Sequence, residues 1–277
     1  MQSPIARSEV SSDPGTVTLP RTMRQAVRAE FARAFRPPYE TPGVVVMNGL
    51  LMTGAWLLLP RSWLFDFTGT MAFPMILAGW MYADVPATNV FAPDRRRILA
   101  AFDDGRELRL LLFAKNAVLW LFVTPLCIAI AVGLGLFEHQ WIATALTIVV
   151  IALAPLGVLG LSAILGTYFP YHPVPLRWRW EHRRNRRMLV RWGTLVLLPY
   201  VLVPALAVVV LAPTLEAWNE LSDKNLKQLS DLDFAIGAVI ACTVGVALWI
   251  IGHRAVVTLA RRRGERLTSY LADPSSG

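Results

Sequence analysis

Few side chains in this chain could carry out chemistry, and they are widely separated. A phosphate-binding loop for ATP needs a glycine directly before its lysine, but alanine, aspartate and leucine precede the three lysines, which are Lys115, Lys224 and Lys227. Neither a CxxC nor an HExxH motif occurs, and the histidines fall in loops or at the ends of apolar segments. The histidines are His139, His172, His182 and His253. We therefore expect no enzymatic activity, metal or cofactor on this chain.

Ionisable residues are also missing from the middle of the apolar segments. Ion-driven carriers need a protonatable or ion-binding group near the bilayer midplane. Here Lys115, Arg191 and Arg254 are expected near the cytoplasmic face, where their long side chains can extend to water. The run 103–106 is superficially similar to a lipid-headgroup transferase motif, but the further spaced aspartates are missing. Both classes of protein are disfavoured.

The composition places the chain in a membrane. Of its 277 residues, 55% are apolar and 17% are charged, with a mean hydropathy of +0.48; soluble domains have about 45–50% and about 25%. The apolar residues gather in runs close to the roughly 20 residues that span a bilayer, which excludes a water-soluble protein. Cys127 and Cys242 both lie in such runs, which excludes a disulfide-built secreted domain.

Six apolar runs predict an all-α, polytopic membrane domain over residues 44–259. The expected spans are 44–59, 64–82, 110–137, 141–169, 188–212 and 234–259. Arginines cluster before the first span, after the second and fourth spans, and in a basic tail at 260–277, whereas the other side carries only Arg61, Lys224 and Lys227. The positive-inside rule therefore predicts six spans with both termini cytoplasmic, in the plasma membrane.

The net charge of +8 is explained by the arginines that gather on the expected cytoplasmic side. In a soluble protein it would indicate nucleic acid, and the loop 168–187 does mix arginines with tyrosines and tryptophans. Next to the end of a span, however, the same mixture is the expected aromatic belt and positive-inside cluster. We expect no nucleic-acid partner.

The segment before the first span divides in two. Residues 1–20 are rich in Ser, Pro, Gly and Thr and are expected to form a flexible cytoplasmic arm. Residues 21–38 predict an amphipathic helix that lies at the membrane interface and ends at Pro37-Pro38. Its apolar stripe consists of Met23, Val27, Phe31 and Phe35. A helix docked on the protein's own loops is the alternative.

Two further patterns concern packing and docking. Asp94 is expected to cap a short helix through Ile98 and Phe102, followed by a turn at 103–105. This helix is either a docking element for a cytoplasmic partner or a solvated hairpin.

In the last span, small residues recur every four positions, which predicts either packing within the chain or a dimer contact. They are Gly237, Ala241 and Gly245.

The layout resembles the ABC-2 class of ABC transporter permeases. Shared features are the amphipathic helix, six spans with both ends inside, a capped polar helix between spans two and three, and a helical external loop before span six. The stretch 103–116, DDGRELRLLLFAKN, is similar to the family's segment leading into the third span, where Lys115 matches a lysine. The run 169–175, FPYHPVP, is similar to the end of the fourth span in actinobacterial members.

The resemblance implies the permease subunit of an ATP-driven exporter of a lipid-linked, glycan or amphiphilic substrate. It also implies a separate ATPase subunit that binds ATP and Mg²⁺, a second permease copy (identical or related), and surrounding membrane lipids. Helix 21–38 would be the family's connecting helix, and 94–102 its coupling helix, unusually basic here. The residues expected to couple to the ATPase are Asp94, Arg95, Ile98, Leu99, Phe102, Asp103 and Asp104. A non-transporting scaffold or anchor subunit of a larger membrane complex remains the alternative.

Overall fold

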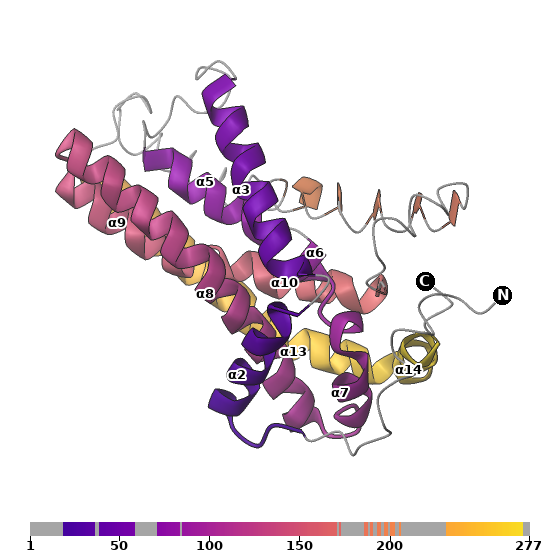
Figure 1. Cartoon of the computed structure of the whole chain (residues 1–277). Helices are drawn as coiled ribbons and strands as arrows, with labels where there is room; N and C mark the ends of the chain where they lie inside the picture. The colour runs from indigo at the N-terminus through magenta and orange to yellow at the C-terminus, as the bar shows by residue number, and fades with distance from the viewer. Residues whose placement is uncertain are drawn as a thin grey trace.

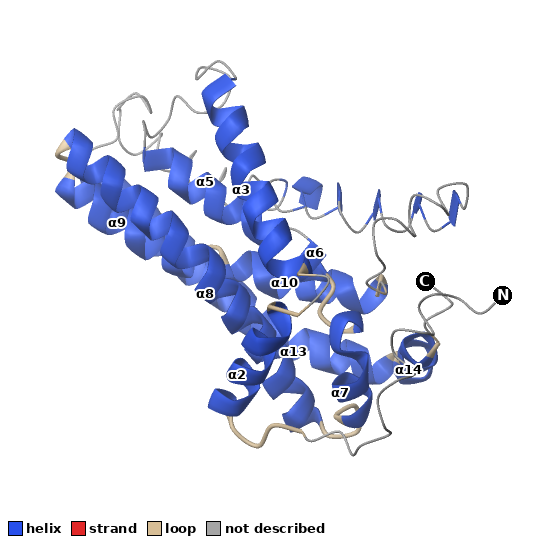
Figure 2. Cartoon of the chain, in the orientation of Figure 1, coloured by secondary structure: helices blue, strands red, loops and turns tan. Residues whose placement is uncertain are grey.

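The described part of this chain consists of helices, turns and loops without strands (Figure 2). The computed structural model describes residues 19–36, 39–58, 71–83, 85–170, 172 and 231–273, with short pieces between 186 and 205. Within these ranges the all-α prediction is confirmed. The arm 1–18, Pro37-Pro38, residues 64–70 of the second expected span and most of the fifth lie outside the described residues.

Four helical segments are long and apolar enough to cross a membrane, as expected of a membrane-embedded protein. They are Thr41–Leu58, Gly105–Glu138, Trp141–Tyr168 and Phe234–Arg262. They match the first, third, fourth and sixth expected spans. The shorter apolar helix α5 (Ala72–Tyr82) falls within the second.

The long helices pack side by side, and short helices gather at one end (Figure 1). Helix α8 (Gly105–Glu138) packs on α9 (Trp141–Leu153), on α5 and on α3 (Glu40–Leu58), and α5 also contacts α9. Helix α13 (Asp231–Arg262) packs on α9 and most extensively on α10 (Leu156–Tyr168).

Several arginine-bearing segments meet at one end of the molecule, which we call the arginine-rich end. It comprises the first turns of α8, the last turns of α13 and four short elements (Figure 1). The short elements are α2 (Met23–Ala34), η2 (Ala92–Asp94), α7 (Arg95–Ala100) and α14 (Gly264–Ala272). Helix α6 (Val85–Thr88) connects α5 to them.

Helix α8 is longer than a membrane crossing requires. Its 34 residues extend about 50 Å at 1.5 Å per residue, against a hydrocarbon core of about 30 Å. The Asp104 carboxylate caps its start, accepting hydrogen bonds from the main-chain N–H of Arg106 at 2.7 Å and of Glu107 at 3.4 Å. His139, in the left-handed conformation (φ 57°), ends it. Pro125 lies inside the helix.

The fourth span is interrupted at Ala154 and Pro155, where α9 ends and α10 begins. Proline has no N–H to donate, so the helical ladder breaks and frees main-chain carbonyls. The indole Nε1 of Trp120 on α8 donates to the carbonyl oxygen of Ala152 at 2.9 Å. The interruption is thus stabilised by the neighbouring span.

Glycines allow α10 and α13 to approach closely at this interruption. A Cβ on Gly245 would overlap the main chain of Ala154, and one on Gly160 would lie 2.7 Å from the carbonyl oxygen of Leu248. Gly237, by contrast, is exposed with nothing within 4 Å of a Cβ, and Ala241 is half-buried. Of the expected ladder, then, Gly245 is the member in close main-chain contact. The contact face continues through Gly252 instead.

Candidate functional site

The residues expected to couple to a partner lie on and beside α7, but they do not share one exposed face. The side chain of Ile98 is 0% exposed and that of Phe102 is 7% exposed. Both belong to an apolar core formed with the ends of α8, α10 and α13 and with α14. Leu99, Asp94 and Arg95 are half-buried, and Asp103 and Asp104 are exposed.

This arrangement corrects part of the expectation. Ile98 and Phe102 cannot contact a partner while they fill this core, so the outward face of α7 is formed by the exposed Arg96 and Ala100. These two positions are four residues apart and therefore lie on the same face of a helix. We call α7 and α14 together the basal cap.

Asp94 differs from its expected role as a helix cap. It precedes α7, as predicted, but its side chain makes no capping hydrogen bond. Instead its carboxylate accepts a hydrogen bond at 3.3 Å from the guanidinium of Arg97 within the same short helix. The nearby guanidinium competes with the backbone for the carboxylate.

Helix α14, and with it the basal cap, is attached to the end of α10 by ring stacking and hydrogen bonds. The ring of His172 stacks on Tyr270, with centroids 4.6 Å apart, and its Nε2 lies 2.9 Å from the Tyr270 carbonyl oxygen. Arg263, just before α14, donates to the carbonyl of Thr167 at 3.2 Å and covers the Tyr168 ring. The cap is thus joined to several membrane-length helices by both polar and apolar contacts.

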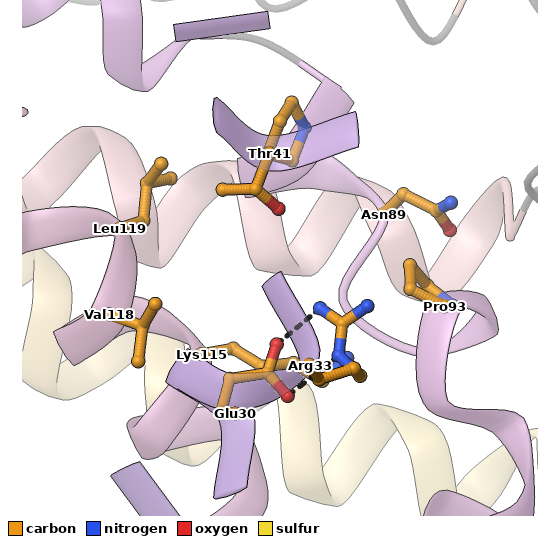
Figure 3. Close-up of a pocket in the computed structure, with 9 residues that line it drawn as sticks. Glu30, Arg33, Thr41, Asn89, Pro93, Lys115, Val118 and Leu119 are labelled. Atoms are coloured by element: carbon orange, nitrogen blue, oxygen red, sulfur yellow. Dashed lines mark hydrogen bonds and ion pairs between the residues drawn. The ribbon is translucent and has the colours of Figure 1, made fainter. Parts of the chain in front are cut away.

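A second cluster, which sequence reasoning missed, joins α2 to α8. Glu30 is 6% exposed, and both of its carboxylate oxygens accept hydrogen bonds from Arg33, one of them from Nε at 2.9 Å (Figure 3). Lys115 on α8 is 8% exposed, and its Nζ has no hydrogen-bond partner among the residues that the structure describes. We call these three residues the charge junction.

Lys115 therefore does not extend to water as we expected. Helix α2 covers it, and the Glu30 carboxylate faces its ammonium. Burial alone would raise the pKa of the Glu30 carboxyl, but the charge of Lys115 and the hydrogen bonds from Arg33 outweigh burial and hold that pKa below its ordinary value. Glu30 thus stays ionised near neutral pH.

The charge junction borders a small cavity. Its walls include Thr41 at the start of the α3 span, Asn89 and Pro93 (Figure 3). The cavity volume of about 30 Å³ has room for one or two water molecules. Such water would satisfy the Lys115 ammonium, but the cavity is too small for an organic substrate.

The apolar stripe of α2 is largely exposed, although its two phenylalanines also contact α8. Met23, Phe31 and Phe35 are exposed and Val27 is half-buried, whereas Ala26, Glu30 and Ala34 are buried. Phe31 also stacks on Phe122 of α8 at 5.4 Å between ring centroids. Helix α2 is thus docked on the membrane-length helix α8, and the exposed part of its apolar stripe remains available to lipid.

Among the described residues, no group of three or more His, Cys, Asp and Glu side chains could hold a metal ion. Cys127 and Cys242 are buried and unpaired with each other. His253 lies 3.2 Å from the Arg109 carbonyl oxygen.

Comparison of the chain with family models, with curated proteins and with solved structures finds no match.

Proposed function

We propose that this chain is the membrane permease subunit of an ATP-driven exporter of the ABC-2 type. It works in the plasma membrane with a second permease copy and a separate ATPase subunit, which binds ATP and Mg²⁺. The exported compound is lipid-linked, glycan or amphiphilic. Both termini face the cytoplasm, and the arginine-rich end faces the ATPase.

The observation that carries this proposal is the construction of the basal cap. Arg96 and Ala100 face outward on α7, while Ile98 and Phe102 on the same segment fill a core shared with the ends of α8, α10 and α13. A partner that binds the outer face would push on a helix that is packed against several spans. Motion of an ATPase would then reach the membrane without an ATP site on this chain.

The experiment is co-reconstitution of the chain with the ATPase encoded beside its gene. We expect the wild-type chain to stimulate ATP hydrolysis. The double variant Arg96→Glu, Ala100→Glu should reduce that stimulation about tenfold. The two glutamates would repel an acidic partner surface that Arg96 attracts, and a tenfold loss corresponds to about 1.4 kcal/mol of binding free energy. Arg24→Glu on the exposed side of α2 is the matched charge reversal and should leave it unchanged.

Two results would contradict the proposal. If the wild-type chain does not change hydrolysis, or if Arg24→Glu reduces it as much as the α7 variant, α7 is not a coupling helix. Purification of the chain in mild detergent with other membrane enzymes and without an ATPase would instead favour the scaffold or anchor function.

A further inference from the structure

A groove at the arginine-rich end, separate from the basal cap's outer face, is lined by four arginines. It lies between the first turns of α8 and the last turns of α13 and has a volume of about 450 Å³. The cavity is therefore much larger than the one at the charge junction. Its lining residues are Arg109, Arg254, Val257, Thr258, Arg261 and Arg262.

Among the described residues, none of the four arginines of this groove forms an ion pair with an acidic side chain. Arg109 donates from Nε to the Gly105 carbonyl at 2.9 Å, and Arg261 donates from Nη2 to the Asp103 carbonyl at 3.0 Å. Both acceptors are uncharged main-chain oxygens. The described lining residues include no acidic side chain. Several guanidiniums that share one groove match the paired oxygens of a phosphate group.

The glycine at the start of α8 helps to place one of these guanidiniums. A Cβ on Gly105 would lie 2.8 Å from Cζ of Arg261. The absence of a side chain at this position lets the Arg261 guanidinium lie directly against the start of α8. The first turn of α8 and the last turn of α13 are thereby held together, with Arg261 at the wall of the groove.

The groove lies at the end of an apolar helical segment of 29 residues, which is about 44 Å long and therefore extends beyond a hydrocarbon core of about 30 Å. Arg262 is the last residue of α13, and Arg254 lies eight residues earlier, about 12 Å along the helix axis. The groove thus runs from the helix end into the apolar segment, and the buried Val257 lies between its arginines. Arginines above an apolar floor suit a ligand with a phosphate and an acyl chain.

We propose that the arginine groove binds the phosphate of an anionic phospholipid in the leaflet at the arginine-rich end. Phosphatidylglycerol and cardiolipin carry this chemistry. The phosphate lies between the guanidiniums, and the acyl chains continue along α13. This binding does not depend on the ATPase partnership, so it can be tested on the isolated chain.

The test is native mass spectrometry of the delipidated protein, titrated with phosphatidylglycerol or with zwitterionic phosphatidylcholine. We expect preferential binding of phosphatidylglycerol, and a roughly 30-fold loss of affinity in Arg254→Gln, Arg262→Gln, since each arginine near the surface contributes about fivefold. Neither side chain makes a described hydrogen bond, so the fold should persist, as an unchanged melting temperature will verify. Arg254→Lys, Arg262→Lys should keep most of the affinity.

The matched control is Arg106→Gln, Arg266→Gln. It removes two exposed arginines at the same end of the molecule, outside the groove, and should lower affinity much less. Equal losses in both double variants would show diffuse surface attraction and overturn the proposal, as would equal binding of the two lipids. If inorganic phosphate displaces phosphatidylglycerol at equal concentration, the groove binds soluble phosphate, and the lipid assignment is wrong.

Discussion

Glu30 stabilises the contact between α2 and α8 because it is the acidic member of a cluster with two cations, of which Lys115 is buried and Arg33 half-buried. Arg33 donates hydrogen bonds to both carboxylate oxygens, and Lys115 interacts electrostatically from the other helix, with no hydrogen bond to any described residue. Removing the acid leaves the buried ammonium of Lys115 beside the half-buried guanidinium of Arg33. Removing Lys115 leaves a carboxylate that is still paired. The two residues are therefore unequal partners.

We predict that Glu30→Gln destabilises the protein by about 3–5 kcal/mol, the usual cost of breaking a buried ion pair from one side. Lys115→Met should change stability by less than about 1 kcal/mol or increase it, because it removes an ammonium that is buried without a hydrogen bond. Thermal unfolding in detergent measures both.

The double variant Glu30→Gln, Lys115→Met serves as the control for this pair. It should recover part of the loss, because one uncompensated cation has gone. If Lys115→Met is the more harmful single change, the ammonium contributes a contact of its own and our account of the charge junction is wrong.

The docking of α2 should also depend on acid pH. The pKa of Glu30 is lower in the folded protein than its ordinary value of 4.5, so its stabilising contribution is complete above about pH 5 and is lost as the pH falls below 4.5 through the folded pKa. A spin label at Arg24→Cys should stay immobile down to pH 5 and gain mobility only below that. Release between pH 7 and 5 would contradict this assignment, and Glu30→Gln should lack the acid-dependent step.

The sequence held a signal for the charge junction that hydrophobic periodicity does not use. Glu30 is the single acid in 21–36, and Lys115 is the single lysine before residue 224. Isolated opposite charges, each in an otherwise arginine-rich or apolar setting, indicate a pair. Their separation along the chain, however, hides the contact until the two helices are placed in space.

At the scale of helices, the α10–α13 contact depends on which glycines face the neighbouring backbone. Gly245→Ala should destabilise the protein by about 1–3 kcal/mol, because its Cβ would lie 2.7 Å from Cα of Ala154, where neither backbone can move easily. Gly237→Ala is the matched control on the same helix, with open space around it, and should be neutral or stabilising by up to about 1 kcal/mol. Melting temperatures in detergent compare the two. Equal losses of melting temperature in the two variants would show that both glycines lie in close helix contacts and would contradict this prediction.

The four membrane-length helical segments could be predicted from apolar runs, but helix faces could not. The stripe from Met23 to Phe35, which has one apolar residue every four positions, falls on α2 and its C-cap, yet Met23 and Phe31 are exposed and Ala26 and Ala34 are buried. In water an apolar stripe faces the protein core, whereas beside a membrane lipid is an equally good partner and small residues favour close helix contacts. The same reason explains why the ladder of Gly237 and Gly245 was only partly a contact face.

For the whole molecule, the predicted orientation can be tested by labelling cysteines in intact cells. Single cysteines at Arg24 and Ser269, which are exposed at the arginine-rich end, should react with a membrane-impermeant maleimide only after the membrane is opened. A cysteine at Gln140, exposed between α8 and α9 at the other end, should react in intact cells. The native cysteines are buried and should give little background. Labelling of Gln140→Cys and Ser269→Cys from the same side would refute this topology.

The long helix α8 has a mechanical consequence. Pro125 lies 20 residues from Gly105, a distance of about 30 Å along the axis, and a proline inside a helix weakens the backbone ladder at that point. A bend of about 10° there would swing the base of α8 sideways by about 5 Å, carrying α2 and the packed underside of α7 with it. A small change in the bend angle at Pro125 would therefore produce a displacement of several ångströms at the arginine-rich end.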